Sequence, residues 1–256
     1  MNQPATVFLG ETSCTVEHEE TYPLRTSISF DTLEHDPQAE VKVFVQMEPP
    51  TVLDLRSELI EKHEDFDLIL GWEESILALP NAEKLIFGTS WIDSEALEGG
   101  EKKNLVTFLL GDKNTSPGHK LRQIVWRNFP RALPYLHVAV HRSPPWMENR
   151  NAFYETAMFS VAIENEKLDN WITEKLIDCL VTKTIPIYWG CPNVSEYFDP
   201  DGMLFFETRG ELYNLLDELT PEFYNDRKDA IEANAEMAQD YVNFHPRINT
   251  AILSAA

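Results

Sequence analysis

Four residues between two apolar segments carry side chains suited to binding a charged ligand. Asn165, Trp171, Glu174 and Lys175 lie in the stretch IENEKLDNWITEKLIDCLVTKTIPIYWG, residues 163–190. Glu174 and Lys175 occupy the expected first turn of a helix, where unpaired backbone N–H groups and the helix dipole favour an anion. Lys175 could neutralise a diphosphate, and Glu174 could accept hydrogen bonds from hydroxyls of a ribose or a sugar. The alternative is an ordinary capped helix start, where the dipole favours Glu174.

Glu174 and Lys175 are adjacent in the sequence. On a helix, side chains three or four residues apart face each other, whereas direct neighbours do not. We therefore expect no structural ion pair between these two residues, which favours a role toward a ligand.

A basic segment lies upstream of these residues. Residues 102–131 include seven Lys and Arg and one acidic residue, a net charge of +6 within a chain whose net charge is -22. The loop GDKNTSPGHK in this segment supplies residue types that contact phosphate, without the GxxxxGKS or GxxxxGKT spacing of a P-loop. The segment therefore favours an anionic ligand, or it is a basic helix face balanced by acidic neighbours. His119, in the same loop, either contacts phosphate or caps the helix.

The elements that position these residues follow from the alternation of apolar and amphipathic segments, a pattern typical of parallel sheets covered by helices. In the first part of the chain we expect a helix at 52–63 and strands at 27–30, 42–47, 66–72 and 84–88. In the second part we expect helices at 118–129, 149–157 and 172–181, and strands at 104–111, 137–142, 159–165, 185–190 and 203–207. A long polar helix is expected over 221–244, packing back across the first domain.

The pattern predicts an α/β protein with two Rossmann-like domains that face a crevice. A polar segment at 94–103, which contains Gly99 and Gly100, marks the boundary and gives domains of residues 1–97 and 98–256. Ligands of such sheets bind outside the carboxyl ends of the strands. Asn165 is the last residue of an expected strand, which places the helix start after it at that edge.

Composition excludes several classes of function. The 256 residues are 43% hydrophobic, which is ample for a large core, and 43 acidic residues against 21 basic ones argue against nucleic acid and anionic membranes as partners. No apolar run approaches the roughly 18 residues of a membrane span, and the start lacks a signal-peptide pattern. We therefore expect a cytoplasmic protein without an integral membrane segment. The three cysteines have no CxxC pair, so neither a disulfide framework nor a zinc site is expected.

The stretch from Phe159 to Glu207 resembles the donor-binding signature of the alpha-1,3/4-fucosyltransferase family, glycosyltransferase family ten. In that family, F-x-x-x-x-E-N is followed by an aromatic residue, T-E-K, a helix, P-I-Y-W-G and Y-F-x-P, and this chain keeps the order and the spacing. Weaker likeness extends upstream. VFVQMEPP and FDLILGWEESIL are similar to the acceptor-side domain of the family, and FLLGDKN with GHKLR to the start of its donor domain.

This resemblance implies a GT-B-type enzyme with a reduced N-terminal domain. It would be an inverting glycosyltransferase that moves a sugar, most simply fucose from GDP-fucose, to a hydroxyl of a glycan acceptor. Asn165, Trp171, Glu174 and Lys175 fall on donor-site positions, and Arg122 falls on the phosphate-contacting arginine of the family. Trp171 stands where many members have Tyr, so that a phenol hydroxyl would be lost while a stacking face remains.

Glu48, in QMEPP, falls on the acidic residue proposed as the general base of the family. The resemblance implies no required cofactor, and a divalent metal is not expected because Lys175, Arg122 and a helix start would stabilise the leaving diphosphate. Asp65-Phe66-Asp67 spells the DxD motif of metal-dependent glycosyltransferases, but it leads into an expected strand instead of following one. We interpret it as a strand entry.

Two departures from the family pattern concern acceptor recognition. Ala157-Met158-Phe159 replaces a usual Tyr-Lys-Phe, Asn149 and Arg150 lie where a Lys is common, and the first domain is short. The alternative function is therefore a non-catalytic nucleotide-sugar or glycan-binding protein with the same fold. Among the other candidates, His137 and His141 are expected at the surface or packed, and Trp189 in the core.

Overall fold

The computed structural model describes residues 6–9, 24–93, 97, 99–129, 137–142 and 150–255, and for residues 6–8 and 137–142 it describes the backbone alone. The chain forms two compact units, Met1–Phe87 with Asn243–Ala256, and Gly88–Val242. The boundary expected between residues 97 and 98 stays a prediction. In the described parts of the chain, no helix is both long and apolar enough to cross a membrane.

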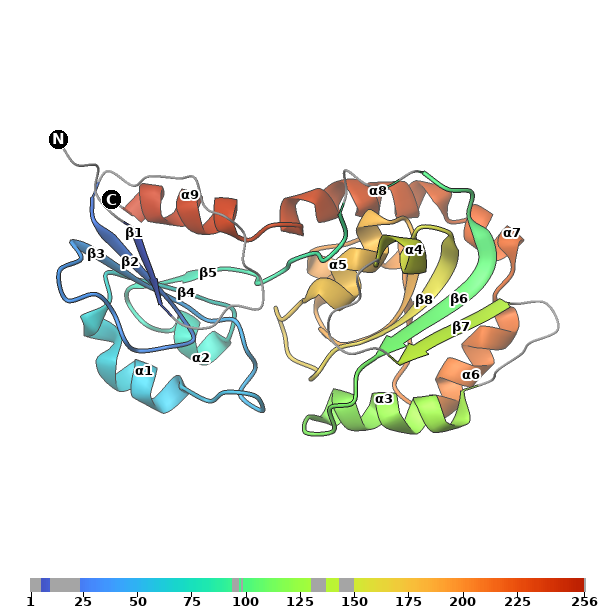
Figure 1. Cartoon of the computed structure of the whole chain (residues 1–256), viewed down its shortest axis with the longest axis horizontal. Helices are drawn as coiled ribbons and strands as arrows, with labels where there is room; N and C mark the ends of the chain where they lie inside the picture. Colours follow the sequence, from blue (N-terminus) through green and yellow to red (C-terminus); the bar gives the residue numbers. More distant parts are fainter. Residues whose placement is uncertain are drawn as a thin grey trace. The chain divides into compact units, whose positions relative to one another are not determined.

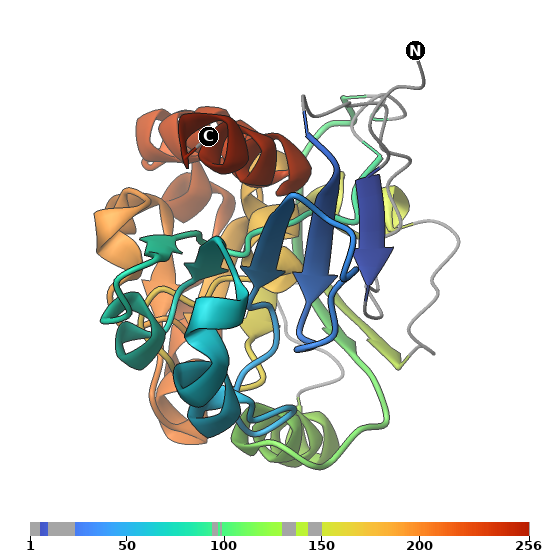
Figure 2. The ribbon, with the colours of Figure 1, turned by 90° about the vertical axis from the view of Figure 1, so that its left-hand side faces the viewer.

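The first unit contains a parallel sheet with helices on both faces (Figures 1 and 2). Its strands are β1 (Thr6–Leu9), β2 (Thr26–Phe30), β3 (Val41–Val45), β4 (Leu68–Gly71) and β5 (Ala82–Lys84). Its helices are α1 (Arg56–Lys62), the 3-10 turn η1 (His63–Asp65), α2 (Glu74–Leu77) and α9 (His245–Ala255). The strands are paired in sequence order, β1-β2-β3-β4-β5.

Alternation along the strands explains the two faces of this sheet. Successive strand residues point to opposite faces, so Val43 and Val45 contribute to one buried cluster while Phe44 contributes to another. Phe44 packs with Leu59 of α1 and Ile76 of α2. The other face is covered by α9, the last helix of the chain.

Helix α9 supplies the cover that α1 and α2 do not. In a sheet whose neighbouring strands follow one another in sequence, right-handed crossovers place the connecting helices on the same face. Phe244, Ile248 and Ile252 are buried against Val43, Val45 and their neighbours on the opposite face. Figure 2 shows α9, in dark red, across the sheet from α1 and α2. The first unit is therefore completed by residues from the far end of the sequence.

The second unit is built on a second parallel sheet with the order β10-β9-β8-β6-β7. Its strands are β6 (Lys103–Leu110), β7 (His137–Arg142), β8 (Ala157–Ile163), β9 (Ile185–Trp189) and β10 (Leu204–Phe205). Its helices are α3 (Pro117–Asn128), α4 (Asn151–Tyr154), α5 (Glu174–Val181), α6 (Arg209–Glu218), α7 (Pro221–Asn225) and α8 (Lys228–Ala238), with 3-10 turns η2 (Val194–Glu196), η3 (Pro200–Gly202) and η4 (Gln239–Tyr241). Helices α3 and α6 lie on one face of this sheet and α5 on the other (Figure 1).

Most of the elements expected in this unit are confirmed, with their ends shifted by a few residues. The long helix expected over 221–244 is wrong, because the chain breaks it into α7, α8 and η4. The segment that packs on the first unit is α9 instead, which the sequence pattern had not indicated. The helix expected over 149–157 is short because Ala157 already begins β8, and the strand expected at 84–88 lies earlier, as β5.

Truncation of one buried α9 side chain tests this arrangement. We expect Ile248→Ala to lower the free energy of unfolding of the first unit by about 2–5 kcal/mol, because it leaves a cavity against the sheet. Leu253→Ala, at a position 56% exposed on the same helix, should change it by less than about 0.5 kcal/mol. Urea denaturation measures both, and equal effects would show that α9 does not cover the sheet.

Candidate functional site

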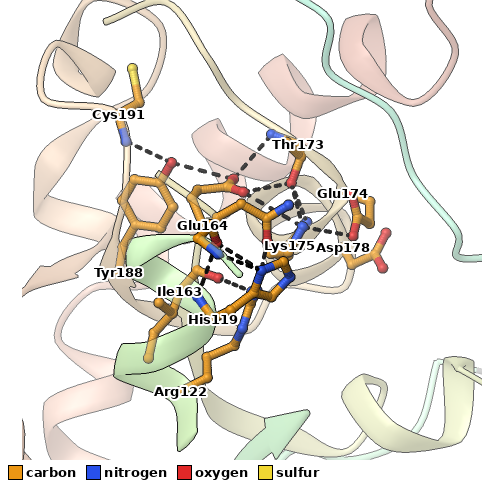
Figure 3. Close-up of polar contacts among 12 residues, drawn as sticks. His119, Arg122, Ile163, Glu164, Thr173, Glu174, Lys175, Asp178, Tyr188 and Cys191 are labelled. Atoms are coloured by element: carbon orange, nitrogen blue, oxygen red, sulfur yellow. Dashed lines mark hydrogen bonds and ion pairs between the residues drawn. The ribbon is translucent and has the colours of Figure 1, made fainter. Parts of the chain in front are cut away.

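The second sheet reverses its direction of growth between β6 and β8. The chain leaves β6 for one edge of the sheet, through α3 to β7, and leaves β8 for the other, through α5 to β9. The two connections separate at the carboxyl ends of these adjacent strands, the topological switch point at which open α/β sheets bind ligands. Helices α3 and α5 both begin at this edge, so their N-termini frame the candidate site (Figure 3).

Gly118 brings the start of α3 against the end of β8. Its N–H donates to the Asn165 carbonyl oxygen at 2.8 Å. A Cβ atom on Gly118 would lie 1.7 Å from the Glu164 carbonyl oxygen, which no side chain can occupy. Position 118 therefore requires glycine because the start of α3 and the end of β8 approach each other closely, and not because of a positive φ.

Arg122 lies one turn further along α3 and binds the residues at the end of β8. Its Nη1 donates to the Ile163 carbonyl oxygen at 2.5 Å, and its Nη2 donates to Asn165 Oδ1 at 2.6 Å. Burial lowers the pKa of the guanidinium to about 10, against the effect of nearby Glu164 and Glu174, so Arg122 remains charged at neutral pH. The structure thus joins two of the predicted donor-site residues directly.

Glu164 belongs to the candidate site but was not among the residues predicted from the sequence, although it stands in the E-N pair of the signature. Its side chain is fully buried, and its carboxylate accepts hydrogen bonds from Thr173 N at 3.1 Å and Thr173 Oγ1 at 2.7 Å. Burial raises the pKa of Glu164, and the charge of Lys175 opposes that rise. Since Thr173 is the N-cap of α5, the carboxylate fixes the start of that helix to the end of β8.

The loop after β9 closes on the same carboxylate. Tyr188 Oη lies 3.5 Å from Glu164 Oε1 and accepts a hydrogen bond from Cys191 N at 3.0 Å. A Cβ atom on Gly190 would lie 2.3 Å from Tyr188 Oη and 2.5 Å from Glu164 Cγ. The glycine of the P-I-Y-W-G stretch therefore leaves room for this buried pair.

Glu174 and Lys175 form an ion pair, with Lys175 Nζ 3.0 Å from Glu174 Oε1 (Figure 3). The expectation that adjacent residues would not pair is wrong here, because both side chains belong to the first turn and extend beyond the helix end. Lys175 Nζ also donates to Thr173 Oγ1 at 3.2 Å and lies 3.7 Å from Glu164 Oε2. Burial alone would raise the pKa of Glu174, but the charges of Lys175 and Arg150 and its hydrogen bonds lower it below its usual range.

Arg150 and Asp178 form a second ion pair near Glu174, a contact that no motif or spacing in the sequence indicates. Asp178 lies one turn after Glu174 on α5, is fully buried, and has Oδ2 3.1 Å from Arg150 Nη1. Its Oδ1 accepts hydrogen bonds from Ser90 Oγ and Trp91 N, each at 2.8 Å. The Arg150 guanidinium lies 3.9 Å from the centre of the Trp91 ring. Arg150 departs from the lysine common in the family but remains a cation next to Glu174.

Trp171 is 2% exposed, so its ring is packed inside the second unit in this structure. A role in stacking on a ligand stays a prediction. The neighbouring Asn170 has a φ of 63°, in the left-handed region. Its Oδ1 accepts hydrogen bonds from Asn193 Nδ2 at 2.9 Å and Tyr197 Oη at 2.5 Å, which ties the loop before α5 to the loop after β9.

His119 completes the start of α3 as the third helical residue of a capping box. Ser116 Oγ accepts from His119 N at 3.2 Å, and Ser116 N donates to His119 Nδ1 at 3.2 Å. Burial, together with the charges of Arg122, Lys175 and Lys113, lowers the pKa of His119 to about 4. The capping role weighed for His119 from the sequence is confirmed.

Glu48, the predicted general base, lies in the first unit after β3. Its N–H donates to Asp31 Oδ2, and the Met47 N–H donates to Asp31 Oδ1, both at 2.9 Å. Asp31 has a φ of 48°, and burial raises its pKa to about 6, helped by the charge of Glu48. Arg122, Asn165, Glu174 and Lys175 are brought together within the second unit, whereas Glu48 belongs to the other unit.

The basic segment of the sequence does not form one surface. Lys102 lies at the opposite end of β6, where its Nζ donates to the carbonyl oxygens of Tyr154 and Ala157 and to Thr184 Oγ1. Among the described residues of the segment, Arg122 and Lys113 are the cations whose charges act on His119 at the start of α3 or that bind the end of β8. Lys102 therefore has a structural role. The basic segment is neither one ligand-binding surface nor one balanced helix face, because its residues have different roles.

Other candidates have structural roles. Asp67 Oδ2 accepts a hydrogen bond from Lys42 N at 2.8 Å directly before β4, which confirms the strand-entry interpretation of the DxD sequence. Trp189 packs against the core of the second unit, as expected. Asn149 and Arg131 lie outside the described residues, as do the side chains of His137 and His141. Within the described residues, no group of three or more His, Cys, Asp or Glu side chains is arranged to hold a metal ion.

Solved structures of glycosyltransferases share this fold. An alpha1,3-fucosyltransferase crystallised with GDP matches 81% of this chain and 69% of its own, with a TM-score of 0.53 and 18% identity. A structure of S. aureus TarM with UDP matches 90% of this chain and 54% of its own, with a TM-score of 0.52 and 12% identity. The α/β fold with two Rossmann-like units, of the GT-B glycosyltransferase type, is therefore confirmed.

Sequence relatives narrow the class further. Residues 137–222 match the family model "Glycosyltransferase family 10 (fucosyltransferase) C-term". The chain is 41% identical over 54 residues to the alpha-(1,3)-fucosyltransferase FucT of Helicobacter pylori, and 29% identical over 79 residues to an alpha-(1,4)-fucosyltransferase of Arabidopsis thaliana. These alignments cover 11% and 20% of the two relatives. The resemblance seen in the sequence is confirmed for this segment, which contains every predicted donor-site residue except Arg122.

Substitution of Gly118 tests the close approach at the switch point. We expect Gly118→Ala to destabilise the second unit by more than about 3 kcal/mol, because its methyl group would overlap the Glu164 carbonyl oxygen and the backbones must separate. Gly210→Ala is the matched control, since a Cβ there lies 3.8 Å from its nearest neighbour. Thermal denaturation compares them, and two equally stable variants would contradict the proposed constraint.

Acid should destabilise the second unit through His119. The pKa of His119 in the folded protein, about 4, lies below the unfolded value of 6.5. Above pH 6.5 the imidazole is neutral in both states, and stability is lost as the pH falls toward 4, because the unfolded state binds the proton more tightly. The loss approaches about 3 kcal/mol. His119→Gln keeps an acceptor for the capping box but does not titrate. Unfolding free energies between pH 7.5 and pH 4 should fall more steeply in the wild type, whereas parallel curves would contradict the shift.

Proposed function

We propose that this chain is an inverting glycosyltransferase that transfers a sugar, most simply fucose from GDP-fucose, to a hydroxyl group of a glycan acceptor. The observation that carries the proposal is the convergence of Arg122, Asn165, Glu174 and Lys175 at the switch point of the second sheet. Asn165, Glu174 and Lys175 match donor-site positions of the signature, and Arg122 matches the phosphate-contacting arginine of the family. The names of the two sequence relatives, both fucosyltransferases, supply the sugar, and the alpha1,3-fucosyltransferase crystallised with GDP supplies the nucleotide.

The main chemical demand is stabilisation of the leaving diphosphate. Preorganised donors in a partly buried site stabilise developing negative charge strongly, because they need no reorganisation during the reaction. Arg122 is held by two oxygens at the end of β8, and Lys175 by Thr173 and its two glutamate neighbours. Together with the N–H groups at the start of α5, these cations take the role of a metal ion, so we expect transfer to persist in EDTA.

The Glu174–Lys175 ion pair holds both charged side chains at the start of α5. In this proposal the ammonium group of Lys175 turns to the diphosphate when the donor binds, and Glu174 accepts hydrogen bonds from the ribose or sugar hydroxyls. Arg150 supports Glu174 during this exchange, because its charge already lowers the pKa of that carboxyl group. Glu174 therefore stays ionised, as an acceptor of two hydroxyl hydrogen bonds must.

Glu48 is the general base of the proposed single displacement. It takes the proton of the acceptor hydroxyl as the oxygen attacks the anomeric carbon and the bond to the diphosphate breaks, with inversion. General-base assistance is worth about 10²–10⁴-fold in rate.

Loss of the carboxylate at position 48 tests this role. Glu48→Gln keeps the backbone N–H that binds Asp31 and removes the base, so transfer should fall by about 10²–10⁴-fold with GDP affinity unchanged. Transfer and calorimetric titration measure the two quantities. A variant with normal turnover would remove Glu48 from the mechanism, and a wild type that binds GDP but transfers to no glycan would favour the non-catalytic binding function.

Removal of the Lys175 charge tests the diphosphate contact. We expect Lys175→Ala to remain folded and to lose about 10²–10³-fold in turnover, the usual effect of deleting one preorganised donor. Lys183→Ala removes the same charge from the opposite end of α5, where Lys183 pairs with Glu232 at the surface, and should behave as the wild type. Release of GDP from GDP-fucose in the presence of candidate glycans measures both.

A preference for GDP over UDP distinguishes the proposed donor site from a protein that shares only the fold. Calorimetric titration with GDP and UDP should give binding that favours GDP and that weakens in Lys175→Ala. Absence of binding to either nucleotide would contradict the proposed donor site.

A further inference from the structure

We propose that His119 is a further donor-binding residue of this site, and that its Nε2–H donates a hydrogen bond to a diphosphate oxygen of the nucleotide sugar. This inference rests on the proposed function and names one more contact within it. His119 lies in the GHKLR segment, three residues before Arg122. Residues three apart on a helix are neighbours on its surface, so both side chains belong to one face at the start of α3.

The hydrogen bonds at Nδ1 fix where the imidazole proton lies. The backbone N–H of Ser116 can only donate, and it is directed at Nδ1 across 3.2 Å. Nδ1 must therefore be an unprotonated acceptor, and a ring in this state carries its proton on Nε2. The hydroxyl group of Ser116, 2.8 Å from Nδ1, can donate to the same atom because it accepts from the His119 backbone N–H. The neutral Nε2–H tautomer follows from this geometry.

The second ring nitrogen is the part of His119 left for a ligand. His119 is 8% exposed, and among the described residues its hydrogen bonds all involve Nδ1 or the backbone N–H. Nearby Arg122, Lys175 and Lys113 all lower the pKa of the ring, so the ring lies among cations. A ring N–H that uses no acceptor in the described part of the chain and lies among cations favours an anionic oxygen as its partner.

Histidine has a physical advantage over Glu, one of the two residues usual at the third position of a capping box. Glu at this position would place a carboxylate beside the diphosphate, and Lys would add a fourth cation to a crowded cluster. Neutral His accepts at one end of the ring and donates at the other. It therefore adds a hydrogen bond without adding charge, and its protonation stays constant over the neutral pH range.

Two variants with the same capping ability separate a ligand contact from a helix cap. His119→Gln keeps both features, since one amide atom accepts from Ser116 and the other donates. His119→Glu keeps the acceptor and replaces the donor with a second acceptor. Lys120→Gln, at the next and exposed position of α3, changes the net charge by the same amount as His119→Glu.

We expect calorimetric titration with GDP to give affinities within a few-fold of the wild type for His119→Gln and Lys120→Gln, and a loss of at least about tenfold beyond Lys120→Gln for His119→Glu. Equal losses in His119→Glu and Lys120→Gln would overturn the inference and leave His119 as a cap alone. Failure of the wild type to bind GDP would instead overturn the proposed function.

A spectroscopic measurement on the wild type keeps the inference testable even where a variant fails to fold. Long-range ¹H–¹⁵N spectra of histidine-labelled protein should give the Nε2–H tautomer for His119, with the Nε2 resonance moving on addition of GDP. A protonated Nδ1, or an Nε2 resonance that does not respond to saturating GDP, would overturn it.

Discussion

The buried carboxylate of Glu164 is the interaction on which the candidate site depends. A carboxylate removed from water is stable only with hydrogen-bond and charge partners. Glu164 obtains them from Thr173, Tyr188 and Lys175, which come from the connection after β8, the next strand and the first turn of α5. Satisfying one desolvated group therefore fixes the position of the helix N-terminus and of the ammonium group that carries the proposed chemistry.

Topology determines why these groups meet. In the second sheet the order reverses between β6 and β8, so α3 and α5 start from adjacent strands and leave on opposite faces. The contact of Gly118 with the backbone at Glu164 brings α3 close enough for Arg122 to reach Asn165. The first sheet has no such reversal, and the face that its own crossovers leave bare is covered by α9. The two units thus solve the same burial problem in different ways.

The sequence predicted the parts of the molecule in which local pattern and fold agree. Strand β7 and helix α3 were expected almost to the residue, because apolar periodicity and a Ser-Pro start are local signals. Helix α9 was missed, because its burial depends on a sheet formed much earlier in the chain, and no pattern in its own segment indicates that contact. The division of 221–244 into separate helices also follows from packing, since no proline interrupts that segment after Pro221.

Within the site, residue types were easier to predict than their partners. Asn165, Glu174, Lys175 and Arg122 could be selected by motif, but the Arg150–Asp178 contact joins residues from separate segments that no spacing relates.

The net charge of the whole chain also says little about where an anion binds. Charges separated by more than a Debye length of about 8 Å are largely screened, so an overall charge of -22 does not prevent anion binding where cations are concentrated. Lys102 shows the converse, because it contributes to the basic segment while its ammonium group binds carbonyl oxygens at the far end of β6. The proposed anion recognition therefore depends on three or four oriented groups and not on the charge balance of the whole sequence.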